Sequence, residues 1–139
     1  MFANNFKTKQ IILFNIIRIN KKEFMIGIDI ENIKRFKNLS NHLIERVYTK
    51  NEIEYCNSHT NSHIHFAGMW CAKEAVVKAL NDLSLTVSEI EILHKSSGSP
   101  YVNISPKLQQ YFEDNSIKNI HISISHTDTI ATAIAIIER

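Results

Sequence analysis

WCAKEAVVKAL, residues Trp70 to Leu80, is the stretch around which the fold of this chain is organised. It contains no Gly or Pro, and its apolar residues recur at three- and four-residue spacing, so it predicts a helix. Glu74 and Lys78 are four residues apart and therefore share one face of that helix. Taken alone, the pair is most simply a surface ion pair, which stabilises a helix by about 0.2–0.5 kcal/mol.

The length and composition indicate one globular domain. The chain has 139 residues, 44% hydrophobic and 22% charged, which suffices for a real core. Its two cysteines, Cys56 and Cys71, form no CxxC motif, so we expect buried thiols in a reducing compartment. No apolar run approaches the length that spans a membrane. We therefore expect a cytoplasmic protein without a membrane partner.

The net charge of +2 is unevenly distributed. Residues 1–24 hold five basic residues and one acidic residue, a balance of +4, which leaves −2 for residues 25–139. A nucleic-acid binder has a basic body, so no nucleic-acid partner is expected. We interpret residues 1–24 as an extension upstream of the true start or an expression addition, with an amphipathic targeting segment as the alternative. The domain itself is expected to span residues 25–139.

The segment FMIGIDI, residues 24–30, is rich in β-branched residues and predicts a buried strand. Asp29 interrupts this apolar segment, and burying an unpaired carboxylate costs several kcal/mol. One explanation is that Asp29 ends the strand and caps the following helix. The other is that the strand holds Asp29 as a metal ligand.

The remaining elements follow from periodicity and turn signals. Residues 31–50 have helical character, and the capping-box spacing of Thr49 and Glu52 predicts a new helix near Asn51. A central helix over about 64–81 is followed by a hairpin within 85–104, a short helix over 106–115, and two strands within 121–137 broken at 126–129. The expected fold class is α+β.

Three histidines precede the central helix: His59, His63 and His65. They suggest a metal site, but no Cys or carboxylate nearby completes a tetrahedral ligand set. We therefore interpret them as ordinary loop and helix-start residues.

Several segments together resemble the holo-acyl-carrier-protein synthase family of the phosphopantetheinyl transferase superfamily. They are GIDI (27–30), ERVYTKNE (45–52), AGMWCAKEAVVKAL (67–80), GSPY (98–101) and ISISHT (122–127), in this order. The resemblance implies a small antiparallel sheet packed against a long central helix. It also implies transfer of the phosphopantetheine arm of coenzyme A to a serine of an acyl carrier protein, releasing adenosine 3′,5′-bisphosphate, in fatty acid biosynthesis.

The resemblance implies a catalytic set of Asp29, Glu74 and Lys78. Mg²⁺ is often held by one or two carboxylates and completes its shell with phosphate and water, so Asp29 and Glu74 are the expected ligands. Lys78 is expected to contact the pyrophosphate as a point charge. The base that deprotonates the acceptor serine is left open between Asp29, Glu74 and a water held by the metal.

The coenzyme A site is expected to combine the central helix, the GSPY loop and the turn after ISIS. Its predicted residues are Lys73, Lys78, Gly98, Pro100, His126 and Thr127. For His126 the alternative is a polar residue at a strand turn. Many family members carry Arg at the position of Met69 and a basic residue at Ser99, and Lys73 or Lys95 could supply the missing positive charge.

A set of basic residues suits an acidic carrier protein. The set comprises Lys34, Arg35, Lys37, Arg46 and Lys50, and the alternative is a solvated helix face. The resemblance further implies a homotrimer with active sites between subunits. The rival function is a module that binds coenzyme A or a nucleotide without turnover.

Overall fold

The computed structural model describes residues 23–139, so nearly all of the predicted N-terminal extension lies outside it. The strands are β1 (Phe24–Asn32), β2 (Glu91–His94), β3 (Pro100–Asn103), β4 (Asn119–His126) and β5 (Ile130–Glu138). The α-helices are α2 (Asn41–Val47), α3 (Lys50–Asn57), α4 (Ser62–Leu80) and α5 (Pro106–Asp114), with 3-10 turns η1 (Ile33–Phe36) and η2 (Val87–Glu89).

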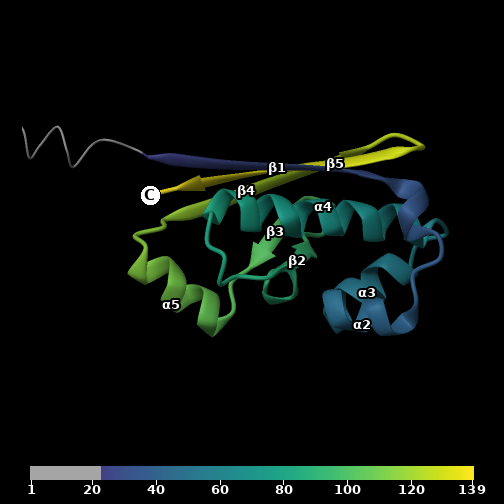
Figure 1. Cartoon of the computed structure of the whole chain (residues 1–139), viewed down its shortest axis with the longest axis horizontal. Helices are drawn as coiled ribbons and strands as arrows, with labels where there is room; N and C mark the ends of the chain where they lie inside the picture. The colour runs from purple at the N-terminus through teal and green to yellow at the C-terminus, as the bar shows by residue number, and fades with distance from the viewer. Residues whose placement is uncertain (1–22) are drawn as a thin grey trace, which may run out of the picture.

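The central helix α4 lies between two layers. On one side is an antiparallel three-stranded sheet in the order β1-β5-β4, and on the other are the β2-β3 hairpin and the shorter helices (Figure 1). The predicted α+β class with one long central helix is confirmed. Because strand and helix segments far apart in sequence meet along α4, this helix positions most of the functional side chains.

Small residues bring α4 very close to the sheet. A Cβ at Gly27 in β1 would overlap the carbonyl oxygen of Ala75 and lie 2.6 Å from the nitrogen of Ala79, so only glycine fits there. The facing positions of β5 are also small, with Ala131, Ala133 and Ala135 almost fully buried. This close approach places the next inward residue of β1, Asp29, directly against α4.

β1 is not the fully buried strand that its composition predicted. Only alternate residues face α4, and Ile26, Ile28 and Ile30 point outward with 64%, 63% and 66% of their surface exposed. On the neighbouring strand, Ile134 and Ile136 pair with Ile28 and Ile26 on the same outer face. The outer face of the sheet is therefore apolar along β1 and β5, and no other described element of this chain covers it.

The other predicted elements are largely confirmed. Thr49 caps α3 in a capping box with Glu52, and the hairpin, the helix α5 and the two C-terminal strands form where expected. The predicted end of the first strand is wrong, because β1 includes Glu31, which the sequence places in a segment of helical character. Among the described residues, no helix is long and apolar enough to cross a membrane.

Candidate active site

The centre of the site is an ion pair between β1 and α4. Lys78 Nζ lies 2.6 Å from Asp29 Oδ1 and also donates to the carbonyl oxygen of Ile28 at 3.3 Å. The Lys78 side chain is about half exposed, at 51%, whereas the Asp29 side chain is 10% exposed. Asp29 therefore neither ends its strand nor caps a helix; the cap of η1 is Asn32. The hydrogen bond from Lys78 to Asp29 raises the pKa of the lysine.

Glu74 adds a second carboxylate one helical turn before Lys78. Partial burial, and after it the negative charge of Asp29, raise the pKa of Glu74, and Lys78 opposes this shift. Glu31, two residues after Asp29 on the same face of β1, also raises it. The two predicted metal ligands thus lie close enough to repel each other, and a cation between them would relieve that repulsion.

The two carboxylates fit a magnesium ion. Asp29 Oδ2 is buried and has no hydrogen-bond partner, although its other oxygen is paired with Lys78. Within residues 23–139 no group of three or more His, Cys, Asp or Glu side chains is arranged to hold a metal. Two carboxylates with remaining positions for phosphate and water are the arrangement that Mg²⁺ commonly uses, whereas a structural zinc site needs four protein ligands.

The predicted role of Lys73 as a coenzyme A contact is wrong. Lys73 Nζ pairs with Glu52 Oε2 at 2.6 Å, and both side chains are 0% exposed. Glu52 also accepts hydrogen bonds from the backbone nitrogens of Thr49 and Ile92. Lys73 lies five residues before Lys78 and hence about 140° around the helix, so it points into the core instead of the site.

The other predicted nucleotide residues lie in three places. Gly98 and Pro100 of the hairpin line a pocket of about 240 Å³ together with His126 of β4. Thr127 lies in the β4–β5 turn, where its hydroxyl oxygen accepts a hydrogen bond from the backbone nitrogen of Ile130 at 3.1 Å. Lys78 belongs to the Asp29 centre, on a later turn of α4 than the residues of the pocket.

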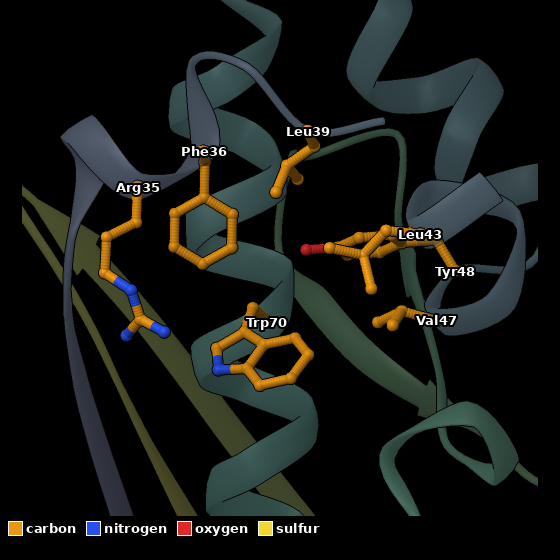
Figure 2. Close-up of a pocket in the computed structure, with 7 residues that line it drawn as sticks. All are labelled: Arg35, Phe36, Leu39, Leu43, Val47, Tyr48 and Trp70. Carbon is orange, nitrogen blue, oxygen red and sulfur yellow. The ribbon is translucent and has the colours of Figure 1, made fainter. Parts of the chain in front are cut away.

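A second, apolar pocket of about 100 Å³ lies beside η1 and α2. Figure 2 shows Arg35 on one side of it and Leu43, Val47 and Tyr48 on the other, with Phe36 and Trp70 between them. Arg35 is exposed and forms an ion pair with Glu31. The predicted basic docking residues are all exposed, and they are Lys34, Arg35, Lys37, Arg46 and Lys50.

Sequence reasoning missed four residues of this region. Glu31 could have been found, because it follows Asp29 at the two-residue spacing of one strand face. Three other residues that line the larger pocket, Tyr55, His65 and His94, come from α3, α4 and β2. They are too far apart in sequence for any spacing rule to join them.

Comparison with known proteins places the chain in a family. The 4′-phosphopantetheinyl transferase superfamily matches residues 25–135. A holo-acyl-carrier-protein synthase of Protochlamydia amoebophila is 42% identical, covering 80% of this chain and 94% of that protein. The enzyme of that name from Caldicellulosiruptor saccharolyticus is 39% identical, with coverages of 84% and 97%.

Two further likenesses bear on the fold and on the extent of the match. The solved holo-acyl-carrier-protein synthase of Helicobacter pylori, in complex with coenzyme A, shares 30% identity at a TM-score of 0.70, covering 81% of this chain and 99% of its own. The fatty acid synthase alpha subunit of Candida parapsilosis is 35% identical, but the chain spans only 7% of its length.

These matches confirm the resemblance that the motifs predicted. The chain belongs to the 4′-phosphopantetheinyl transferase superfamily and, within it, to the holo-acyl-carrier-protein synthase family. It is an enzyme.

Proposed function

We propose that this enzyme transfers the 4′-phosphopantetheine group of coenzyme A to a serine of an apo acyl carrier protein. The serine oxygen bonds to the phosphorus that bears the pantetheine arm, the pyrophosphate bond breaks, and adenosine 3′,5′-bisphosphate leaves with the bonding electrons. The observation that carries the proposal is the buried, unpartnered Asp29 Oδ2 beside Glu74 and Lys78.

Asp29 and Glu74 would hold Mg²⁺ in this reaction. Bound there, the ion would neutralise charge on the pyrophosphate as its bond breaks. Lys78 is half exposed, so its ammonium can turn from Asp29 toward a phosphate oxygen and stabilise the departing phosphate. The proton of the serine hydroxyl leaves to one of the two carboxylates, directly or through water.

The carrier protein docks, in this proposal, on the predicted basic residues around the smaller pocket. Arg35 at that pocket supplies a positive charge for an acidic partner, and the apolar walls accept one of its apolar side chains. We expect the double substitution of Arg35→Glu and Arg46→Glu to raise the KM for the carrier at least tenfold, about 1.4 kcal/mol. Coenzyme A binding, measured by calorimetry, should stay unchanged, and an equal loss of both would refute the docking surface.

We also propose that the chain forms a homotrimer through the apolar outer face of the sheet. The exposed Ile26, Ile28 and Ile30 support this, since an exposed apolar stripe on the edge strand of a sheet invites association. An Ile28→Lys variant should lower the mass measured by light scattering, with Leu83→Lys, an exposed apolar position in the loop after α4, as the control. The two buried free thiols, Cys56 and Cys71, support a cytoplasmic setting.

Intact-mass spectrometry tests the transfer directly. Incubation with coenzyme A, Mg²⁺ and apo carrier protein should add one phosphopantetheine to the carrier, and replacing Mg²⁺ with a chelator should stop it. No mass gain at any enzyme concentration would refute the proposed activity. Binding of coenzyme A without any transfer would favour the rival function, a module that binds coenzyme A without turnover. The specific reason to consider that rival is that Met69 and Ser99 stand where many family members have basic residues.

A further inference from the structure

Glu31 lies between the reacting centre and the proposed docking surface. It is the next inward residue of β1 after Asp29, and its side chain is only 15% exposed. Its carboxylate pairs with Arg35, four residues later in η1, whose side chain is 67% exposed. The charge of a largely buried carboxylate is thus balanced by a guanidinium that an approaching protein can reach.

Hydrogen bonds fix the backbone that joins this pair. The backbone nitrogen of Ile33 donates to the carbonyl oxygen of Thr129 at 2.9 Å. The side chain of Asn32 caps η1 by accepting from the backbone nitrogen of Lys34 at 3.0 Å. The part of the link that can move is therefore the long, exposed side chain of Arg35.

The negative charge of Glu31 acts on the reacting centre. Burial is the main cause that raises the pKa of Glu74, and the charges of Asp29 and Glu31 raise it further. Within residues 23–139 no three His, Cys, Asp or Glu side chains are arranged as metal ligands. Glu31 therefore acts on a cation at Asp29 and Glu74 through its charge and not as a third ligand.

The docking surface and the reacting centre are neighbours along α4. Arg35 lines the smaller pocket together with Trp70 (Figure 2). Trp70 lies one turn before Glu74, about 6 Å along the helix axis. An acidic side chain of the carrier that pairs with Arg35 competes with Glu31 for the same guanidinium.

We propose that Glu31 is a positioning residue that couples docking of the carrier to binding of Mg²⁺ through its ion pair with Arg35. In the free enzyme Glu31 holds the guanidinium back, so Arg35 screens the Glu31 charge and is less available to the carrier. When an acidic carrier draws Arg35 away, the charge of Glu31 adds to those of Asp29 and Glu74, and the cation binds more tightly. Coupling between two ligands is reciprocal, so bound Mg²⁺ strengthens docking by the same factor. This inference rests on the proposed function, which supplies both ligands.

The test is a titration of the enzyme with Mn²⁺, followed by the electron paramagnetic resonance signal of the free ion. Mn²⁺ takes the same carboxylate and water ligands as Mg²⁺. The titration is made alone and with a saturating acyl carrier protein whose acceptor serine is replaced by alanine, so that no transfer occurs. In the wild type the carrier should tighten Mn²⁺ binding about threefold, the size expected for a solvent-accessible ion pair.

Variants assign the coupling to the ion pair. Arg35→Gln should tighten Mn²⁺ binding about threefold without any carrier, because the charge of Glu31 is then unscreened. Glu31→Gln should bind the carrier more tightly in the absence of metal, and the carrier should then change its Mn²⁺ affinity much less. In the Glu31→Gln background, Arg35→Gln should have a much smaller effect on Mn²⁺. Glu45→Gln, which removes an equal charge from an exposed position on α2, is the matched control and should leave Mn²⁺ binding and its response to the carrier unchanged.

Two results would overturn the inference: an equal effect of Arg35→Gln on Mn²⁺ with and without Glu31, or a carrier effect that survives Glu31→Gln in full. Arg35 is exposed, so its substitution keeps the inference falsifiable even if Glu31→Gln does not fold. Unchanged or weaker Mn²⁺ binding by Arg35→Gln would overturn it. If transfer to a carrier fails while the coupling is measured, only the proposed function falls; if transfer succeeds without the coupling, only this inference falls.

Discussion

Two lysine–carboxylate pairs on the same helix have the same separation and opposite surroundings. Lys73 meets Glu52 at 2.6 Å with both side chains fully buried, and Lys78 meets Asp29 at 2.6 Å with the lysine half exposed. Both oxygens of Glu52 accept hydrogen bonds, whereas Asp29 Oδ2 has no partner. A fully satisfied pair leaves nothing with which to bind a ligand. The difference indicates that the first pair holds α3, α4 and β2 together, and it supports our proposal that the second pair belongs to the reacting centre.

Breaking the buried pair should give the largest effect. Lys73→Met leaves the Glu52 carboxylate buried without its counter-charge, and losing one partner of such a pair costs about 3–5 kcal/mol. The free energy of unfolding in urea measures this loss. Adding Glu52→Gln removes the orphaned charge and should restore part of the stability. A Lys73→Met protein within about 1 kcal/mol of the wild type would contradict the structural role.

Breaking the open pair should instead affect the reaction. Lys78→Met removes a half-exposed, partly solvent-screened lysine, so the loss of unfolding free energy should be smaller than that of Lys73→Met. The rate of transfer to the carrier should fall about 100-fold or more, because the charge that stabilises the leaving phosphate is gone. Full activity, or a stability loss as large as that of Lys73→Met, would show that the two pairs do not differ in role.

The thiol pKa values of the two cysteines should also respond to changes in the two ion pairs, with a smaller effect than the substitutions above. Burial, the main cause, raises the pKa of Cys56 and of Cys71 to about 12, with added contributions from Glu52 and Asp29 respectively. Asp29→Asn should therefore lower the pKa of Cys71, by less than about one pH unit, and leave that of Cys56 unchanged. Thiolate absorbance during an alkaline titration measures both, and equal shifts would contradict the assignment of each thiol to its own pair.

These raised thiol pKa values also predict whether the free energy of unfolding rises or falls at alkaline pH. In the unfolded chain a thiol ionises near its ordinary value of 9.0. The folded pKa is higher, so the stabilising contribution is complete below pH 9 and is lost as the pH rises toward 12. The free energy of unfolding should fall over this range, and a Cys56→Ala, Cys71→Ala protein should show a shallower fall.

The sequence predicted the elements well because local signals define them. The capping box of Thr49 and Glu52, the turn around Gly98 and the period of α4 are all readable within a few residues. The burial of β1 could not be predicted in this way, because FMIGIDI has apolar residues on both faces. Only the close approach of Gly27 to Ala75 reveals which face meets α4. Resemblance led to Asp29, Glu74 and Lys78, and the geometry now brings these side chains together.

The errors arose from contacts between distant segments. Lys73 looked available for phosphate because nothing in WCAKEAVVKAL indicates that Glu52, 21 residues earlier, would neutralise it in the core. His65 does lie at the start of α4, as expected, but nothing in the sequence shows that His94 of β2 and His126 of β4 line the same pocket. Pairings of this kind depend on tertiary packing, which a spacing rule cannot reach.

The most direct test of the reacting centre is the intact mass of the carrier after incubation with the folded variants Asp29→Ala and Glu74→Ala. Each is compared with the wild type at saturating coenzyme A and Mg²⁺, with circular dichroism confirming the fold. The wild type should convert the carrier to its phosphopantetheinylated form, and neither variant should produce a detectable gain in mass. Conversion by both variants at the rate of the wild type would contradict a reaction centred on these two carboxylates.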